Sequence, residues 1–273
     1  MATRRLGRQR FDHGAQYFSA VSPRFRRQVN EWRQAGVVDE WFRLGGAARY
    51  RAAGGMNAIA KHMAAGLDLH VSTQVTRLLF EHNQWRVETL NGAEYRASAL
   101  LLTAPVPQIL ELLSPLGIEI SPRLHAVRYD PCFALMVALD GPAALPEVGW
   151  ARPDGGPLGW IADNAAKGIT EGPSALTLHA TPEFSRAHFD APADHVAALL
   201  LEAATPWFGD ARVAESQLHR WRYSLVAEPG PEPCCVLRAP APLVLAGDAF
   251  GGPRVEGAYL SGYAAAPALL GES

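Results

Sequence analysis

The chain is poor in cysteine. Its 273 residues include three cysteines, Cys132, Cys234 and Cys235, which are too few for a disulfide framework and lack the spacing of a zinc site. The adjacent thiols at 234–235 could act as a redox pair, but idle thiols are the simpler interpretation. The nine histidines contain no His-x-x-x-His pair, so we expect no metal centre. With so few cysteines, a reducing cytoplasm is the expected location.

The chain also lacks an excess of charge of either sign. Its formal net charge is −2 and charged residues make up 19%, so no electrostatic attraction to nucleic acid or to an anionic membrane is expected. No run reaches the roughly 18 apolar residues that a membrane-spanning helix needs. The basic start has no apolar segment behind it, as a signal peptide would have. No pattern predicts an oligomeric state.

The most informative stretch lies near the end, at residues 243–262. Leu243-Val-Leu-Ala is a short apolar run typical of a buried strand. Gly247-Asp248 follows it, and a glycine-rich turn then leads into a segment with small residues at helical spacing. The aspartate can accept from a ligand hydroxyl, and the N–H groups at a helix start favour an anion. An ordinary strand–turn–helix corner is the alternative interpretation.

Hydrophobic periodicity predicts a succession of helices and strands. The length of the chain allows one large domain or two smaller ones. A Ser22 cap before Pro23 predicts the start of the first helix, and Pro267 predicts a break in the last one. Leu100–Leu102 is apolar enough for a buried parallel strand. Helices are predicted within 23–36, 57–66, 106–113 and 193–207. Strands are predicted at 69–71, 74–80, 84–90, 94–102, 126–139, 158–162, 175–180 and 216–223, and a linker at 229–233.

Several stretches together resemble one family. They are Phe11-Asp-His-Gly-Ala-Gln-Tyr-Phe18, Thr103-Ala-Pro105, Leu158-Gly-Trp-Ile-Ala162, Leu178 to His188, His219-Arg-Trp-Arg-Tyr223 and Ala246 to Ala258. The combination resembles the bacterial renalases, flavoproteins related to the monoamine oxidases. The resemblance implies an α/β (α+β) fold of p-hydroxybenzoate hydroxylase or amine oxidase type. It implies a Rossmann-like FAD-binding domain formed by residues 1–10, 67–122 and 233–273. A substrate domain with an antiparallel sheet would comprise 11–66 and 123–232.

The resemblance also implies where FAD and substrate would bind. Asp248, after Gly247, would meet the ribityl or pyrophosphate part. Gly257 and Ala258, next to Glu256, would place N–H groups near the flavin N1–C2=O edge, where a helix start favours negative charge. Gly14, Ala15 and Gln16 would pass beside the isoalloxazine, Val75 would meet adenine, and Ala104 would approach the cofactor. Candidate substrate residues are Trp160, His179, Arg220, Trp221 and Tyr223.

Structural alternatives stand beside these roles. Gly14 can serve a turn, and the aromatic residues can pack in a core. His13 and His179 suit a structural role because flavin hydride transfer needs no strong protein base. Arg220 and Arg222 share one strand face, where they could meet a phosphate or carboxylate or form a surface pair.

The chain contains no Gly-x-Gly-x-x-Gly, the turn that holds the pyrophosphate in flavoproteins of this class. Its start, Met1-Ala-Thr-Arg-Arg5, resembles the segment that follows the first βαβ unit of the family. We therefore expect that unit to be missing, and Leu243–Leu245 and its neighbours to lack a pairing partner. The 273-residue chain would then purify colourless or aggregate, and a chain extended upstream would be yellow.

The family's activity gives the leading functional hypothesis. Its members oxidise isomers of NADH or NADPH and pass the electrons to oxygen, forming hydrogen peroxide, with FAD and no metal. The alternatives are a flavin amine oxidase with another donor and a truncated, non-catalytic remnant that cannot hold FAD.

Overall fold

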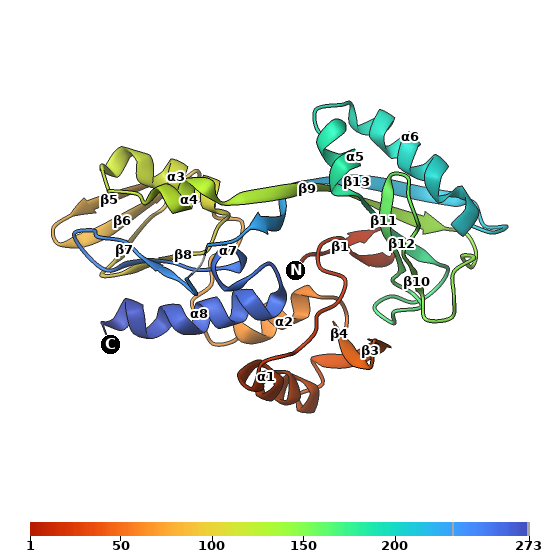
Figure 1. The fold of residues 1–273 in the computed structure, drawn as a ribbon, viewed down its shortest axis with the longest axis horizontal. Helices are drawn as coiled ribbons and strands as arrows, with labels where there is room; N and C mark the ends of the chain where they lie inside the picture. The colour runs from red at the N-terminus through yellow and green to blue at the C-terminus, as the bar shows by residue number, and fades with distance from the viewer. Residues whose placement is uncertain (231, 272–273) are drawn as a thin grey trace. The chain divides into compact units, whose positions relative to one another are not determined.

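The computed structural model describes residues 1–230 and 232–271, which form two compact units (Figure 1). Unit 1 comprises residues 1–65 and 130–225, and unit 2 comprises residues 66–129 and 226–273. The predicted linker at 229–233 lies in unit 2, and its residue 231 falls outside the described part of the chain.

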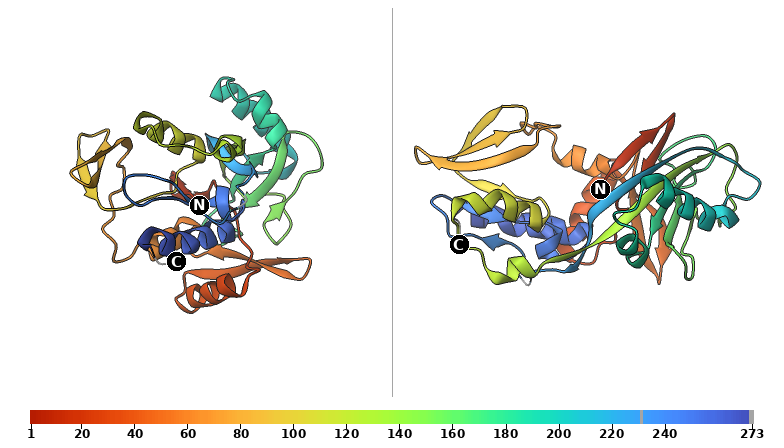
Figure 2. Two further views of the ribbon diagram at one scale, coloured as in Figure 1. Left: turned by 60° about the vertical axis from the view of Figure 1, so that its left-hand side comes forward. Right: turned by 90° about the horizontal axis from the view of Figure 1, so that it is seen from above.

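Unit 1 is built on a five-stranded sheet in the order β10-β11-β12-β9-β13, which appears with its helices in Figure 2. Alternate residues of β9, β11 and β12 bury their side chains against α6 in one hydrophobic cluster. A hairpin of β1 and β2 and a second of β3 and β4 complete the unit with α1 and α2. The strands are β1 Thr3–Leu6, β2 Gln9–Asp12, β3 Val38–Leu44, β4 Ala47–Ala52, β9 Arg128–Leu139, β10 Trp150–Ala151, β11 Leu158–Asp163, β12 Ala175–Ala180 and β13 Val213–Glu228. The helices are α1 Pro23–Gln34, α2 Asn57–Met63, α5 Pro182–Ala187, α6 Ala193–Ala204 and the 3₁₀ turn η2 Thr205–Trp207.

Unit 2 contains a three-stranded meander, β5-β6-β7, and a small sheet in the order β14-β15-β8. β15 runs parallel to β8 and antiparallel to β14. Leu243 and Leu245 pack on the side of α3, while Val244 packs on the side of α8. The strands are β5 Val75–Glu81, β6 Gln84–Thr89, β7 Glu94–Ala97, β8 Leu100–Leu102, β14 Cys235–Val236 and β15 Leu243–Leu245. The helices are α3 Val106–Leu113, η1 Ser114–Leu116, α4 Pro122–Ala126, α7 Asp248–Gly251 and α8 Val255–Leu270.

Local sequence signals account for most of these elements. The Ser22 hydroxyl accepts from the N–H of Phe25 at the start of α1, with Pro23 in the first turn, so the predicted cap is confirmed. The predicted meander and α3 are confirmed too. The fold is the mixed α/β type with antiparallel sheets that was predicted.

The unit boundaries differ from the predicted domain boundaries at residues 1–10. β1 pairs antiparallel with β2, placing Thr3 opposite Asp12, and β2 contacts β12 of the five-stranded sheet. The hairpin therefore belongs to unit 1. Residues 123–129 and 226–232 fall in unit 2 instead of with the antiparallel sheet. The assignment of FAD to one unit and substrate to the other stays a prediction.

Three local predictions were wrong. Residues 69–71 form no strand, and their Leu69 and Val71 side chains are 61% and 72% exposed. A short alternating segment needs a neighbouring strand to pair with, and none of the described strands runs beside it. The predicted break at Pro267 is absent, since helix α8 continues through this residue to Leu270. Proline costs the helix one N–H donor, but Ala268 and Leu269 of the last turn pack on the cluster that contains Val244 of β15.

The third wrong prediction is that Leu243–Leu245 would lack a pairing partner. β15 is fully buried and pairs with β14 and β8, whereas β8 lies at one edge of the sheet, with Leu101 39% exposed. The apolar run Leu100–Leu102 is therefore parallel as predicted but only partly buried. Apolar composition reveals a strand, but not whether it lies in the middle of a sheet or at its edge.

Candidate functional site

Unit 2 brings Ala104 and Gly247 to the same edge of its small sheet. Leu102 of β8 lies opposite Leu245 of β15 in the parallel register. Ala104 and Gly247 each follow their strand by the same two residues, so they lie at the shared carboxyl end. In open α/β sheets this edge is where ligands bind. The sequence resemblance had nominated both residues separately, and the strand register brings them together.

Gly247 and Asp248 form a strained turn between β15 and α7. Gly247 has φ 136° and ψ −168°, a conformation that is essentially restricted to glycine. Its N–H donates to the Ser261 hydroxyl at 2.9 Å, which ties the turn to α8. Burial raises the pKa of the half-buried Asp248, while backbone N–H groups of Asp248 and Ala249 oppose that rise. The turn therefore holds a carboxylate at the strand end with part of its surface open.

Gly257 packs directly against α7. A Cβ built on Gly257 would lie 2.2 Å from the carbonyl oxygen of Gly252 and 2.5 Å from that of Gly251. One on Gly251 would lie 1.9 Å from the carbonyl oxygen of Gly257. The two glycines thus allow backbone to meet backbone. Glu256, Gly257 and Ala258 occupy the first turns of α8, whose Arg254 N-cap gives no side-chain cap.

Val75 stands apart from this turn. It is the first residue of β5 in the meander and packs, half-buried, on the cluster that also contains Leu243 and Leu245. Its predicted contact with adenine stays a prediction.

In unit 1 the segment from Asp12 to Gln16 lies against one face of the five-stranded sheet. The His13 carbonyl accepts from the Trp221 indole at 2.8 Å and lies 3.3 Å from His179 Nε2. The Gln16 side-chain amide donates to the Asp12 carbonyl at 2.5 Å and to that of Gly14 at 3.1 Å. The His13 ring stacks on Trp221, with centroids 5.4 Å apart. Side chains of the sheet therefore hold the His13 carbonyl, and the Gln16 side chain closes the segment on its own main chain.

Several buried polar atoms near this segment have no hydrogen-bond partner in the described part of the chain. They include Gln16 Oε1 and Trp160 Nε1, in residues that are 6% and 7% exposed. A buried polar group without a partner is costly, and an ordered water or ion is one way in which proteins satisfy such a group. Both belong to residues that the sequence had nominated.

Both histidines of this face are neutral at physiological pH. Burial lowers the pKa of His179 to about 4, against an opposing interaction with the His13 carbonyl. Burial, with His219 and Arg4 nearby, lowers the pKa of His13 to about 4 as well. Neither histidine therefore brings a positive charge to the face, which agrees with the structural role expected for them.

The predicted substrate residues divide between the two faces of the sheet. Trp160 lies opposite His179 across the β11–β12 pair, on the side where the 12–16 segment contacts His179 and Trp221. Tyr223 shares the Trp221 face by strand alternation. Arg220 points the other way, donates to the Ala191 carbonyl at 2.8 Å and covers the rings of Phe133 and Phe189. Arg220 is therefore not brought together with the other candidates.

Trp160 also belongs to an aromatic cluster. Its ring stacks on Trp150 at 4.8 Å, and Tyr17 lies 5.4 Å away. Phe42 completes the cluster. The packing interpretation therefore holds for Trp160, which is 7% exposed.

Sequence reasoning missed Lys167. This residue is fully buried and makes a 2.6 Å ion pair with Asp12. It is one of two lysines in the chain, and its neighbours are alanine and glycine. A lysine in such a turn is normally expected at the surface. Its burial depends on Asp12, a residue 155 positions away, so no local signal could have revealed it.

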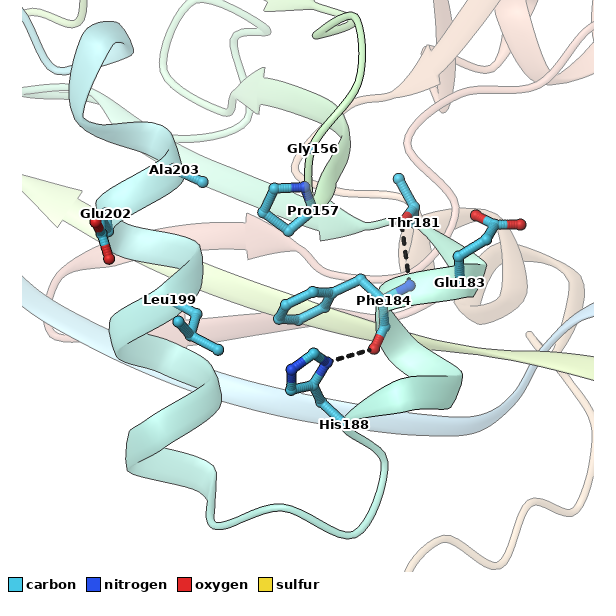
Figure 3. A pocket seen from close by; sticks show the side chains of 9 residues that line it. All are labelled: Gly156, Pro157, Thr181, Glu183, Phe184, His188, Leu199, Glu202 and Ala203. Carbon is cyan, nitrogen blue, oxygen red and sulfur yellow. Dashed lines mark hydrogen bonds between the residues drawn. The ribbon is translucent and has the colours of Figure 1, made fainter.

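Two cavities of unit 1 lie away from the predicted residues. The first, about 520 Å³, is lined by Phe184 of α5, the following His188, Leu199 of α6 and Pro157 (Figure 3). The second, about 590 Å³, is lined by Asp163, Ala165, Ala166 and residues 170–174, with Gly141 and Pro142. None of the nominated site residues lines either cavity.

The three thiols are not suited to nucleophilic chemistry. Burial raises the pKa of Cys132 to about 12, and burial also raises the pKa values of Cys234 and Cys235, so all three are poor nucleophiles. Across residues 1–230 and 232–271, no helix is both long and apolar enough to cross a bilayer. In the same residues no three histidine, cysteine or acidic side chains are grouped as a metal site.

Comparison with solved structures finds the same fold in several proteins. One similar structure is a protein of Exiguobacterium sp. 255-15, provisionally assigned as a protoporphyrinogen oxidase, with 15% identity and a TM-score of 0.56. The match covers 82% of this chain and 52% of that protein. An oxidoreductase from Methanosarcina mazei has 17% sequence identity and a TM-score of 0.53, and the match covers 82% of this chain and 56% of that protein. A redesigned putrescine oxidase has 15% sequence identity and a TM-score of 0.54, and the match covers 82% of this chain and 54% of that protein. At these identities the likeness concerns the fold alone, and the chain spans about half the length of these structures.

The family itself is shown by sequence. The profile of the flavin-containing amine oxidoreductases matches residues 3–270, nearly the whole chain. The chain therefore belongs to this family of oxidoreductases.

Proposed function

We propose that the protein is a renalase-like, FAD-dependent oxidoreductase that oxidises dihydronicotinamides, isomers of NADH or NADPH, with oxygen as acceptor and hydrogen peroxide as product. The observation that carries the proposal is that unit 1 brings the nominated residues together, with the Asp12–Gln16 segment lying on the sheet face that carries His179, Trp160 and Trp221. This face holds neutral histidines and a half-buried Trp221, which suit a flat, uncharged heteroaromatic ligand.

FAD, when bound, would supply the two-electron acceptor, and the protein would bind and orient it. Asp248 would accept from a hydroxyl of the ribityl chain, at the strand end it shares with Ala104. The start of α8, with Gly257 and Ala258, would favour negative charge at the N1–C2=O edge. Gly14, Ala15 and Gln16 would line the ring. The protein's largest contribution would be to hold the reacting atoms in one geometry.

Two features favour a dihydronicotinamide over an amine. The carboxylate of the Asp12–Gln16 segment, that of Asp12, is already paired with Lys167, so it is not available to bind a substrate ammonium. The half-buried ring of Trp221 can contact a planar, neutral ring, and His13 and His179 carry no charge at neutral pH.

The test is anaerobic bleaching of the flavin absorbance. The chain lacks a Gly-x-Gly-x-x-Gly turn, so FAD is supplied in excess and its binding is measured first by titration. We expect isomeric dihydronicotinamides to bleach the bound flavin rapidly and a panel of primary amines to leave it oxidised. Bleaching by amines alone would overturn the proposed substrate class in favour of an amine oxidase. Failure to bind FAD at any concentration would favour a non-catalytic chain.

Asp248→Asn is expected to weaken FAD binding by roughly 10- to 100-fold, because a hydrogen bond to a charged group contributes about 1.5–3 kcal/mol. The same titration measures the change. Glu119→Gln, an exposed carboxylate of the same unit, is the control and should leave the affinity unchanged. Equal affinities for the two variants would remove Asp248 from the site.

A further inference from the structure

The carboxylate of Asp12 joins three separate segments of unit 1. Its Oδ1 accepts from the Thr3 hydroxyl of β1 at 2.6 Å and from the Met56 N–H at the start of α2 at 2.8 Å. Its Oδ2 accepts from Lys167 at 2.6 Å, in the turn between β11 and β12. An ionised carboxylate can accept at several lone-pair positions, so one side chain holds a hairpin, a helix start and a sheet turn.

Lys167 provides the matching charge in the interior. Both side chains of the pair are 0% exposed, and the Lys167 ammonium lies 5.0 Å from the centre of the Trp41 ring. Burial lowers the pKa of Lys167, and the Asp12 carboxylate opposes that change. The ammonium is thus kept in place by one carboxylate and one aromatic face.

The main chain of Asp12 is fixed as well. Its N–H donates to the Asn164 side-chain oxygen at 3.0 Å, and its carbonyl accepts from the Thr177 hydroxyl at 2.9 Å. The same carbonyl accepts from Gln16, at the far end of the Gly14–Gln16 segment. The position of Asp12 therefore sets where this segment begins and how it closes.

A buried ion pair is a poor way to gain stability. Well-packed apolar residues of similar volume do as well or better, because desolvation offsets the attraction between the charges. What apolar residues cannot do is accept three hydrogen bonds from three segments. The pair is therefore better explained by the geometry that it imposes than by the energy that it contributes.

We propose that Lys167 and Asp12 are positioning residues, whose ion pair holds the Gly14–Gln16 segment in the geometry that contacts the ligand of this sheet face. That the ligand is a flavin rests on the proposed function. The positioning itself concerns the protein alone and is measurable without any ligand.

Hydrogen exchange of the chain without added FAD tests the proposal. Lys167→Met removes the charge and keeps most of the length. We expect amide protection over residues 11–18 to fall at least about tenfold relative to wild type, with protection of β9 residues 133–138 retained as the internal reference. Arg212→Met, which breaks the exposed 2.9 Å pair with Asp140 in the same unit, is the matched control and should change neither region. Unchanged protection over 11–18, or an equal loss in β9, would overturn the proposal.

A double variant keeps the test decisive if Lys167→Met does not fold. Lys167→Met/Asp12→Asn leaves no unpaired charge in the interior, so it should fold and still show the loss over residues 11–18. Wild-type protection in the double variant would show that the charges do not position the segment. In FAD-loaded protein the same variant should shift the flavin absorbance band, whereas Arg212→Met should not. If the chain binds no FAD, the proposed function fails while the exchange result still decides the positioning.

Discussion

Gly257→Ala is expected to lower the stability of unit 2 by about 3 kcal/mol or more. The new Cβ would lie 2.2 Å from one backbone carbonyl oxygen of the α7 end and 2.5 Å from another. Backbone atoms cannot move aside as a flexible side chain does, so α7 and α8 must separate, at the upper end of the usual cost of overpacking or beyond it. Since α7 begins at Asp248, the separation should also weaken FAD binding. Urea unfolding measures the stability through a shift of the midpoint.

Gly262→Ala is the matched control, because it lies in the same helix. No atom lies within 4 Å of a Cβ built on Gly262, and its φ is not positive. Alanine there should stabilise α8 by about 0.5–1 kcal/mol, since it gains helix propensity and restricts the unfolded chain. Two variants with similar urea midpoints would show that the contact between Gly251 and Gly257 is looser than the structure has it.

Unit 1 is expected to lose stability steeply as the pH falls from about 6.5 to about 4. His13 and His179 have a pKa of about 4 in the folded chain, because burial disfavours their charged forms, whereas the unfolded value is about 6.5. In this window the unfolded chain binds more protons than the folded chain. The stabilisation is therefore complete above pH 6.5 and lost as the pH falls, by on the order of 3 kcal/mol per histidine.

Urea midpoints at pH 7.5 and pH 5 measure this loss. His179→Gln removes one of the two titrations and should reduce the difference between the two pH values. His62→Gln, at an exposed position of the same unit, should leave the difference as in wild type. If His179→Gln and wild type lose the same stability on acidification, His179 is not buried in neutral form.

Much of the secondary structure follows from short windows of sequence. The Ser22-Pro23 start of α1, the meander with its Asn91-Gly92 turn, and the strand β12 at Ala175–Ala180 were all predictable. Capping, turn chemistry and alternation act between residues a few positions apart. The stretch from Leu243 to Ala258 likewise revealed its strand and helix, and the family, because glycines with special backbone needs leave a pattern in the sequence.

Pairing partners and burial were decided only by the tertiary structure. Alternation was visible at Leu69–Val71, but none of the described strands lies beside it to complete a sheet. An apolar run was visible at Leu100–Leu102, but its place at the sheet edge depends on β15, about 140 residues later. Arg220 was visible as a charged residue of a strand, but the face it occupies depends on the residues packed below it.

The candidate site shows the same division most clearly. The stretches at Gly14–Gln16 and Gly247–Asp248 pointed from the sequence alone to the flavin-containing amine oxidoreductases, to which the chain belongs, while the renalase-like subtype stays a proposal. The tertiary structure alone decided that Lys167 is buried against Asp12 and that the pKa values of His13 and His179 are low. The physical reason is that propensities are properties of neighbouring residues, whereas desolvation and ion pairing depend on groups that only the folded chain brings together.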